Sequence, residues 1–264
     1  MQITRKKIAI VGCGWLGSSL AEFYVKQGNE VAGTTRTPSK AETLNQIGVE
    51  GHILNSFEDD LSWLKTADIL VLNIPPSSFG EEYPNFMVHI ARQLTETARV
   101  LFISSTSVYD NRNLSVNENE VALGNSSRGK TVYQAEKELE KLLGKRLTTI
   151  RMAGLVGKER HPAKYMSGKV YPGQEEPINL IHLTDCIGLI EAVIKKEAWG
   201  EVFNGCAEVH PQKGEYYPWA ARKLNVTPPE FTNETVPFKT VSNEKSRVVL
   251  GYSYRYADPF DFPI

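Results

Sequence analysis

Tyr133 and Lys137 are two residues whose types and spacing could move a proton. They stand in the segment TVYQAEKELEKLL, whose pattern predicts a helix, so their i and i+4 spacing puts both side chains on one face. A tyrosine hydroxyl has an unperturbed pKa of about 10 and is a poor acid or base at neutral pH. An ammonium one helical turn away favours the phenolate and lowers that pKa. The pair predicts acid/base catalysis by Tyr133, although the same spacing also occurs on ordinary exposed helix faces.

A cluster of hydroxyls precedes this helix in the chain. Residues 99–103 (RVLFI) predict a buried strand, which continues into SSTS at 104–107. Polar residues at the end of a buried strand are well placed for a binding site. A hydroxyl such as that of Ser105 could donate a hydrogen bond to a substrate oxygen on which charge develops. The long polar connection that follows, over 110–130, is unusual in a compact domain unless it has a function.

The N-terminal segment KIAIVGCGWLGSSLAEFYVKQG predicts a strand, a tight turn and a helix around a G-x-G-x-x-G motif. Its first glycine allows the turn, its second lets the backbone approach a pyrophosphate, and its third lets the helix lie close to the strand. The helix N-terminus would hold the phosphates of a dinucleotide. We therefore predict cofactor binding by Gly12, Gly14, Trp15, Leu16 and Gly17. The alternative is a plain turn without a ligand.

The residues after the second predicted strand, over 30–34, select the dinucleotide. About twenty residues past the glycine motif, an acidic residue would bind the ribose 2′-hydroxyl of NAD. This sequence instead has Thr34, Thr35 and Arg36, whose hydroxyls and guanidinium suit a 2′-phosphate. We therefore predict NADP, with NAD as the alternative if Arg36 is a solvated loop residue, and we place Thr35 and Arg36 in the cofactor site.

Strands and helices alternate along this half of the chain, which is typical of a parallel sheet. The further strands are expected over 51–54 and 68–72, and the helices over 38–48, 59–64 and 84–97. The strand over 68–72 leads to Pro75 and Pro76, which either line the cofactor groove or stiffen a loop; we include Pro75 in the cofactor site. The predicted fold class is α/β, a Rossmann-like doubly wound parallel sheet with a small C-terminal substrate lobe.

Five motifs follow one another in the chain: GCGWLG, SSTSVY, YQAEK, IRMAGLVG and INLIHLTDC. In this order they resemble an atypical or extended short-chain dehydrogenase/reductase of the NAD(P)-dependent epimerase/dehydratase superfamily, over nearly the whole chain. The resemblance implies that Ser105 is the catalytic hydroxyl, since the family's Ser or Thr stands three residues before Val108. It also implies that Tyr133 is the acid/base, and that Lys137 binds the nicotinamide ribose and lowers the pKa of that tyrosine.

The sequence also departs from the superfamily pattern. Val11 occupies the first glycine position of the usual G-x-x-G-x-x-G, so the motif resembles that of an atypical subgroup. Asn55 lies near the place where many members have an aspartate that contacts adenine. Thr106 and Ser107 stand where a dehydratase of this superfamily would carry acidic residues. Dehydration is therefore disfavoured.

The C-terminal half supplies the remaining elements. Strands are expected over 147–151 and 178–183, with a last strand beginning at 202, and helices up to 196 and over 211–224. Thr184 or Asp185 would cap the first of these helices, and Ser242 and Gly251 would begin and end a final one. We expect a dinucleotide-binding domain over 1–157, to which 178–206 return, and a substrate lobe over 158–177 and 207–264.

Several charged residues in this half are ambiguous. The basic side chains of segment 158–177 could meet a phosphate or carboxylate, or could be solvated loop charges; they are Arg160, His161, Lys164 and Lys169. His182 lies in a strand-like segment, where a lone histidine is more often structural than catalytic. Tyr109 is expected to be a packing residue.

Composition sets the outer limits. The chain has 264 residues and a formal net charge of -1, so nothing suggests nucleic acid or an anionic membrane as a partner. It shows no apolar signal region and no apolar run long enough to span a bilayer, so we expect a cytoplasmic protein. The three cysteines lack metal-ligand spacing and are interpreted as reduced packing residues, and no metal site is expected. Homodimerisation is left open.

Together these residues predict an NAD(P)-dependent oxidoreductase or epimerase. Hydride would move to or from nicotinamide while Tyr133 moves the proton of a secondary alcohol or carbonyl. The substrate would be a small molecule, with sugars and nucleotide sugars among the candidates. The alternative is a non-catalytic NADP(H)-binding or redox-sensing protein.

Overall fold

The computed structural model describes residues 5–120 and 126–264, and by its contacts the chain divides into two units. Unit 1 comprises Met1–Ser104, Ser126–Ile150 and Glu197–Val202, and unit 2 comprises Ser105–Asn125, Arg151–Lys196 and Phe203–Ile264. The prediction returned 178–206 to the dinucleotide-binding domain, whereas the contacts group most of that segment with unit 2. The predicted domain boundaries therefore remain a hypothesis.

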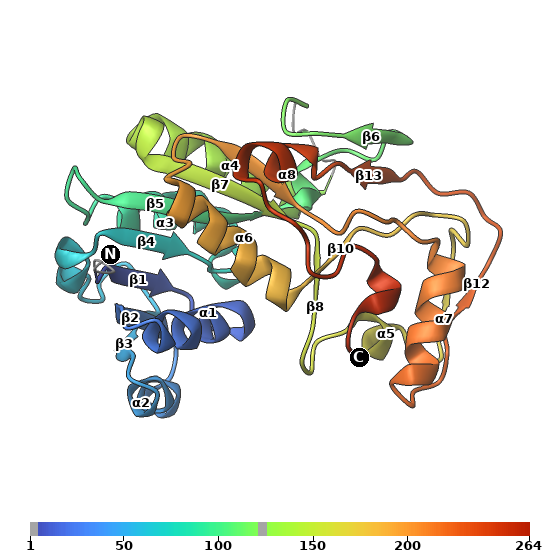
Figure 1. Cartoon of the computed structure of the whole chain (residues 1–264), viewed down its shortest axis with the longest axis horizontal. Coiled ribbons are helices and arrows are strands. Elements are labelled where there is room, and N and C mark those ends of the chain that lie inside the picture. The colour runs from blue at the N-terminus through green and yellow to red at the C-terminus, as the bar shows by residue number, and fades with distance from the viewer. Residues whose placement is uncertain (1–4, 121–125) are drawn as a thin grey trace. The chain divides into compact units, whose positions relative to one another are not determined.

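The largest sheet in the described part of the chain has seven strands in the order β11-β7-β5-β4-β1-β2-β3, and most of its residues belong to unit 1 (Figure 1 labels β1 to β5 and β7). Its strands are β1 (Lys7–Val11), β2 (Glu30–Thr35), β3 (Glu50–Ile53), β4 (Ile69–Leu72), β5 (Arg99–Ser105), β7 (Leu147–Met152) and β11 (Val202–Gly205). β1 pairs in parallel with β2 and with β4, so Ile8 lies opposite both Val31 and Ile69. β2 and β3, and β4 and β5, are also parallel. Because the strand order reverses between β1 and β4, the sheet is doubly wound, and the predicted Rossmann-like fold is confirmed.

The described part of unit 1 contains four α-helices. They are α1 (Trp15–Lys26), α2 (Pro38–Gln46), α3 (Tyr83–Ala91) and α4 (Ser127–Leu143), joined by the short turns η1 (Ser62–Thr66), η2 (Pro76–Ser78), η3 (Gly80–Glu82) and η5 (Gly144–Arg146). α1 packs on β1 and β2, α2 packs on β2 and β3, and α3 packs against α4. The buried face of α1 includes Leu16, Leu20 and Tyr24, whose helical spacing predicted it.

Two helix predictions in unit 1 were wrong in extent or type. The helix expected over 84–97 ends at Ala91, because Ile90 and Ala91 are its last buried residues and Leu94 is only half-buried. The helical segment expected over 59–64 is the short 3-10 turn η1. Its start is set by Asp60, whose carboxylate accepts hydrogen bonds from the backbone N–H and hydroxyl of Ser62.

Unit 2 contains many short elements around its own apolar core. They are η4 (Thr106–Val108), β6 (Leu114–Val116), β8 (Gly154–Val156), α5 (Pro162–Met166), β9 (Val170–Tyr171), β10 (Leu180–His182), α6 (Leu183–Lys196), α7 (Lys213–Lys223), β12 (Glu230–Phe231), β13 (Lys239–Val241), α8 (Glu244–Leu250) and η6 (Pro259–Asp261). Three two-stranded parallel sheets pair β8 with β10, β9 with β12, and β6 with β13. Part of the core gathers around the buried Tyr216 and Phe262.

Two pairings in unit 2 contradict the sequence-based expectations. The connection expected over 110–130 contains β6, although its residues 121–125 lie outside the described part of the chain. The strand that begins at Val202 is not the last, since β12 and β13 follow it. These strands have two or three residues each and pair with partners far away in the chain, so no local period marks them.

The ends of two helices in unit 2 test the capping predictions. α6 is not capped by Thr184 or Asp185; instead His182 Nδ1 accepts a hydrogen bond from the Thr184 N–H at 3.2 Å. At α8, the Ser242 hydroxyl accepts from the Glu244 N–H at 3.3 Å. Gly251 follows α8 with φ of 59°, which confirms it as the helix stop.

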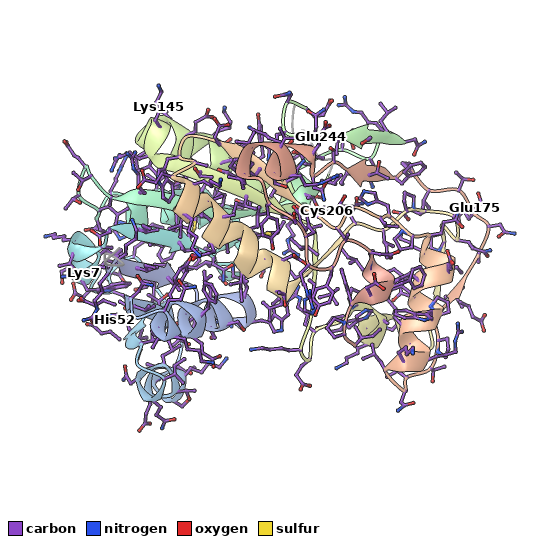
Figure 2. All side chains as sticks on the ribbon, in the orientation of Figure 1. Lys7, His52, Lys145, Glu175, Cys206 and Glu244 are labelled. Atoms are coloured by element: carbon purple, nitrogen blue, oxygen red, sulfur yellow. The ribbon has the colours of Figure 1, made fainter. Side chains whose placement is uncertain are left out.

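The three cysteines are free and buried, as packing residues should be. Cys206 is fully buried, whereas Lys145 and Glu175 are exposed (Figure 2). Burial raises the pKa of each of the three thiols, so all are held as the unreactive thiol. Within 5–120 and 126–264, the helices are all too short or too polar to cross a membrane.

Candidate functional site

The glycine loop lies at the carboxyl end of β1, beside the switch point of the sheet. Gly12 has φ of 105°, and a Cβ on it would stand 2.7 Å from the carbonyl oxygen of Asn73. Gly17 approaches the carbonyl of Gly12 so closely that a Cβ would overlap it. Gly14 differs from both, because a Cβ there would meet nothing within 4 Å. Two glycines are therefore required by the fold, and Gly14 faces open space where a ligand can approach.

Neighbouring strands hold this loop through polar contacts. The Gly12 N–H donates to Thr34 Oγ1 at 2.9 Å, and the Cys13 N–H donates to the Thr34 carbonyl at 2.8 Å. From β4, the Asn73 amide donates to the Gly12 carbonyl at 3.0 Å. Thr34 is 2% exposed, so its hydroxyl supports the loop and is not placed to bind a 2′-phosphate. The sequence did not identify Asn73 or this role of Thr34.

The first turn of α1 fits a diphosphate. Gly14 precedes the helix and offers no capping side chain, and the first turn contains no acidic residue. The first N–H groups of a helix lack partners within it and carry the positive end of the dipole. Such an N-terminus beside an open glycine suits a pyrophosphate. The Leu16 side chain is 3% exposed, so Leu16 could contribute only its backbone N–H.

The end of β2 carries the residues predicted to select the dinucleotide. Thr35 is buried and Arg36 is exposed directly after the strand. The Asn55 amide donates to the Arg36 carbonyl at 3.2 Å, so it fixes the backbone beneath the guanidinium. Hydrogen bonds from the Asn55 and Ser56 N–H groups hold the pKa of Asp59 below its usual range. The Arg36 side chain is thus free of the core and lies on the same sheet edge as the glycine loop.

The segment after β4 is anchored next to the loop. The Tyr83 hydroxyl, from the start of α3, donates to the Ile74 carbonyl at 2.9 Å. Pro75 is exposed immediately after Ile74 and directly precedes the turn η2. The carboxyl ends of β1, β2 and β4 therefore bring together the glycine loop, Arg36 and Pro75 within unit 1.

Tyr133 and Lys137 lie on α4, as predicted. Tyr133 is half-buried and Lys137 is exposed, and Lys137 Nζ donates to Glu140 Oε2 at 2.5 Å. This hydrogen bond to Glu140 raises the pKa of the Lys137 ammonium, and Tyr133 and Glu136 add to the rise. Tyr133 and Lys137 lie one helical turn apart on α4. Glu140 was not recognised from the sequence, although its i+3 spacing marks it.

A buried carboxylate lies beside this pair. Glu136 is 5% exposed and accepts a hydrogen bond from Ser104 Oγ at 2.5 Å, and Ser104 is itself 6% exposed. Both residues belong to unit 1. The Ser104 hydroxyl therefore binds α4, whereas the resemblance selects the next residue, Ser105, as the catalytic hydroxyl.

Ser105 ends β5 and belongs to unit 2. Its Oγ accepts a hydrogen bond from the Ser107 N–H at 3.1 Å, so it caps η4 and keeps its own proton available to donate. Tyr109 is buried, and its hydroxyl donates to Asn204 at 2.8 Å while Arg151 donates to it at 2.8 Å. Burial raises the pKa of the Tyr109 hydroxyl, with Arg151 opposing the rise. Tyr109 is a packing residue, as predicted.

The basic residues of segment 158–177 make local contacts. Arg160, Lys164 and Lys169 each donate to a backbone carbonyl no more than five residues away. His161 is 2% exposed; its Nδ1 accepts from the Ala163 N–H and its Nε2 lies 3.1 Å from the Tyr216 hydroxyl. Burial lowers the pKa of His161 to about 4, with Lys164 contributing, so the imidazole is neutral.

His182 is also structural. It is 7% exposed, and its ring contacts Tyr256 and Phe262. Burial lowers its pKa, with Asp185 opposing. A neutral ring suits its role as the acceptor that caps α6, and His182 is therefore part of the core of unit 2.

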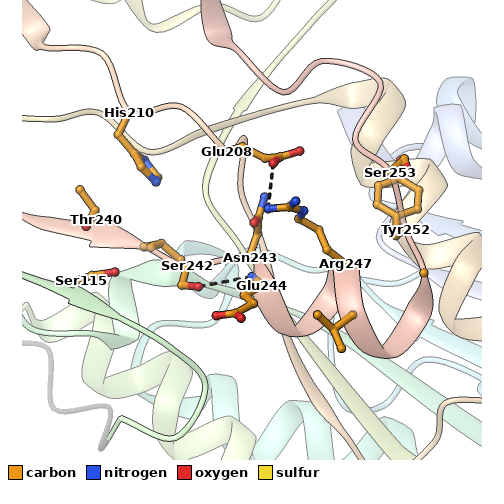
Figure 3. A pocket seen from close by; sticks show the side chains of 13 residues that line it. Ser115, Glu208, His210, Thr240, Ser242, Asn243, Glu244, Arg247, Tyr252 and Ser253 are labelled. Carbon is orange, nitrogen blue, oxygen red and sulfur yellow. Dashed lines mark hydrogen bonds and ion pairs between the residues drawn. The ribbon is translucent and has the colours of Figure 1, made fainter.

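Unit 2 also holds an open polar cavity of about 770 Å³ between β13, α8 and the segment after β11 (Figure 3). Most of its polar groups already hold the unit together. Glu208 pairs with Arg247 at 2.8 Å, and Asn243 donates to the Cys206 carbonyl at 2.8 Å. His210 Nδ1 lies 3.1 Å from the Ile178 carbonyl and must donate to it. No predicted site residue lines this cavity.

Metal binding has no candidate site in the part of the chain that is described. Its His, Cys, Asp and Glu side chains form no group of three or more that could hold an ion.

The strand order defines a protein with a Rossmann-like fold, as the sequence predicted. A family model described as "NADP oxidoreductase coenzyme F420-dependent" matches residues 7–104, the part that carries the glycine loop. Protein YeeZ from Escherichia coli strain K12 is 34% identical to this chain, over 98% of this chain and 99% of its own length. The chain belongs to the family of Protein YeeZ.

Solved structures share the fold at low identity. A functionally unknown conserved protein from Silicibacter pomeroyi superposes with a TM-score of 0.77 and 20% identity, over 96% of this chain and 95% of its own. A UDP-glucuronic acid 4-epimerase from Bacillus cereus, in complex with NAD, superposes with a TM-score of 0.76 and 18% identity, over 94% and 91%. At these identities the likeness concerns the fold.

Proposed function

We propose that this chain is an NAD(P)-dependent oxidoreductase or epimerase that acts on a secondary alcohol or carbonyl and prefers NADP. The observation that carries the proposal is the joint presence, in unit 1, of an open glycine loop at the sheet switch point and a Tyr133–Lys137 pair on α4. The family model over 7–104 and the NAD complex of the similar epimerase support a nicotinamide dinucleotide as cofactor.

The cofactor is assigned to residues that the sheet edge brings together. The backbone of the loop from Gly12 to Gly17 and the N-terminus of α1 would hold the diphosphate. Arg36 would pair with the 2′-phosphate, with Thr35 below it, and Pro75 would line the groove. Lys137 would leave Glu140 and donate to the nicotinamide ribose. When bound, the dinucleotide supplies the hydride acceptor or donor.

Proton transfer is assigned to this chain's own side chains. In oxidation, the Tyr133 phenolate takes the proton of the substrate hydroxyl; in reduction, the phenol returns it to the carbonyl oxygen. The Ser105 hydroxyl donates a hydrogen bond to that oxygen and stabilises its developing charge. The Lys137 ammonium favours the phenolate by its charge.

The substrate assignment is coarser. We propose a small molecule, with sugars and nucleotide sugars as the first candidates because the similar structures include a UDP-sugar epimerase. The predicted substrate lobe over 158–177 and 207–264 would bind it. A cytoplasmic location and a homodimer remain predictions.

The second candidate is a non-catalytic NADP(H)-binding or redox-sensing protein. It is favoured by the contact between Lys137 and Glu140, which holds the ammonium in an ion pair with a glutamate.

The test is a screen of sugars, nucleotide sugars and small carbonyl compounds with NADPH or NADP⁺. We expect Tyr133→Phe to lower turnover about 10²- to 10⁴-fold, because it removes the proton donor. NADPH binding, followed by thermal shift, should persist. Tyr165→Phe is the matched control, since Tyr165 is 68% exposed in unit 2. Equal background turnover in wild type and Tyr133→Phe, with NADPH binding intact, would favour the sensor.

A further inference from the structure

Glu136 is a buried charge for which the proposed chemistry has no use. It belongs to the buried face of α4, which otherwise consists of small or apolar residues: Gly129, Val132, Ala135, Leu139 and Leu143. A carboxylate at 5% exposure is unfavourable unless polar partners compensate it. Its hydrogen bond from Ser104 Oγ, at 2.5 Å, is short and charge-assisted.

The place of the Ser104–Glu136 hydrogen bond in the fold indicates what it does. Glu136 directly precedes Lys137 and follows Tyr133 by three residues, so it lies in the same helical turn as both. Ser104 lies in β5, which pairs with β4, and β4 pairs with β1 below the glycine loop. The hydrogen bond therefore ties the turn of α4 that carries Tyr133 and Lys137 to the sheet that carries the dinucleotide loop. All of these residues belong to unit 1.

We propose that Glu136 is a positioning residue. Its hydrogen bond with Ser104 fixes where α4 lies along its own axis and how it is rotated about that axis, so that Tyr133 and Lys137 meet the bound dinucleotide. This inference rests on the proposed function. An apolar helix face tolerates small slips, whereas a hydrogen bond between buried groups has one good geometry. Misplacement of a catalytic group by about 1 Å can cost about 10²-fold in rate.

The groups around Glu136 indicate that its charge contributes to this role in addition to its hydrogen bond. The carboxylate faces Ser104 from β5, while Tyr83 of α3 and Lys137 of α4 both respond to its charge. Burial raises the pKa of the Tyr83 hydroxyl, and Glu136 adds to that rise, although Arg128 opposes it. Tyr83 also donates to the Ile74 carbonyl next to Pro75, so the charge of Glu136 acts on a side chain that anchors the proposed cofactor site.

A purely structural role makes the opposite prediction about stability. Replacing a buried ionic group by an apolar one of similar volume is often neutral or stabilising. If Glu136 serves positioning, Glu136→Leu should keep or raise the melting temperature and still lower turnover. If it serves only stability, activity should follow the melting temperature.

The experiment compares Glu136→Leu, Ser104→Ala/Glu136→Leu and Glu136→Gln in the full chain. The amide of Glu136→Gln can still accept from Ser104, so this variant should recover most of the lost turnover. Glu191→Leu is the matched control, because Glu191 in α6 is also a buried helical carboxylate, at 8% exposure. We expect both leucine variants at position 136 to lose about 10- to 100-fold in turnover, with a smaller loss of NADPH affinity because the glycine loop still holds the diphosphate.

A readout that needs no substrate completes the test. The ¹³Cζ signal of Tyr133, in protein labelled at its tyrosines and saturated with NADP⁺, is assigned by its loss in Tyr133→Phe. It should move in both leucine variants at position 136 and return toward wild type in Glu136→Gln. An unmoved signal in Glu136→Leu overturns the inference, as does wild-type turnover in that variant. If instead Tyr133→Phe retains turnover, the proposed function fails, while a moved signal would still support positioning of α4 by Glu136.

Discussion

Unit 1 and unit 2 differ in how far along the chain their contacts reach. In unit 1, β2 pairs with the preceding β1, β3 with β2, and β5 with β4, so these neighbours in the sheet are also neighbours in sequence. In unit 2, β6 pairs with β13 and β9 with β12 across long intervening segments. Unit 1 can therefore be predicted from local patterns, whereas unit 2 depends on side chains that hold distant segments together.

The two units also differ in whether their key residues face a ligand or hold the fold together. In unit 1, the glycine loop leaves Gly14 facing open space for a ligand. In unit 2, Asp185 is fully buried and holds the C-terminal segment, accepting from the Tyr252 hydroxyl and from the backbone N–H groups of Arg255 and Tyr256. The first arrangement is built for binding and the second for cohesion. Four predictions test this difference.

The largest effect is expected from Asp185→Ala in unit 2. The substitution removes a fully buried carboxylate and leaves three donors without their acceptor, which should lower the free energy of unfolding by about 4 kcal/mol. Denaturant unfolding measures the loss, and hydrogen exchange should show reduced protection around Arg255 and Tyr256. Asp261→Ala is the matched control, since Asp261 is exposed. Equal stability of the two variants would contradict the role of Asp185.

The glycine loop offers a paired test of fold against binding. Gly12→Ala introduces a side chain at φ of 105° and against the Asn73 carbonyl, so it should cost about 3 kcal/mol of stability. Gly14→Ala meets no protein atom within 4 Å and should fold normally. It should nevertheless weaken NADPH binding about 10-fold, because its methyl group occupies the ligand's space. Normal NADPH affinity in a folded Gly14→Ala would break this distinction.

The buried imidazole of His161 should make unit 2 sensitive to acid. Its pKa falls from 6.5 in the unfolded chain to about 4 in the fold, so between these values only the unfolded state binds the proton. Stability is complete above pH 6.5 and decreases as the pH falls toward 4, by about 3 kcal/mol. Burial also lowers the pKa of His182 and His210, so these two histidines add their own loss of stability in acid. The test therefore compares the loss in wild type with the loss in a variant that lacks only His161. His161→Asn should lose less stability than wild type between pH 7 and about pH 4.5 in urea unfolding; identical losses would refute the assignment.

The smallest effect concerns the choice of dinucleotide. Arg36→Ala should weaken NADPH about 10-fold by removing the guanidinium from the 2′-phosphate, and should leave NADH binding unchanged. Thermal shifts with each dinucleotide measure the difference. Lys40→Ala is the control, since Lys40 is an exposed cation in the following helix. A larger shift with NADH in wild type, or no change in Arg36→Ala, would remove the preference for NADP.

Local patterns were enough to predict most of unit 1. The apolar run before Gly12 and the spacing of Leu16, Leu20 and Tyr24 predicted β1 and α1, because burial on one face imposes a period. The strands at 30–34, 51–54, 68–72 and 99–103 were found to within two residues. The helix over 84–97 was too long, since a helix stops where its neighbours cease to offer a core, and the sequence alone does not show that.

The contacts that complete the site were missed for a different reason. Thr34 binds Gly12 across 22 residues and Asn73 binds it across 61, and Ser104 binds Glu136 across 32. Thr34 and Asn73 are ordinary polar residues with no motif around them, and the motifs that contain Ser104 and Glu136 do not indicate that these two residues pair. Such pairs become visible only when the sheet order brings the ends of different strands together.

The sequence by itself determined which chemical groups the protein has and how they are spaced. They are a phosphate-binding loop made of glycines, an arginine where NAD-binding proteins place an acid, and a tyrosine one helical turn from a lysine. These are local facts, because spacing within one turn or one helix decides them. The tertiary structure decided which polar groups remain available. It turned Thr34 and Ser104 inward as supports, left Gly14 and Arg36 outward, and neutralised His161 by burial, since solvent exposure and long-range pairing depend on the whole fold.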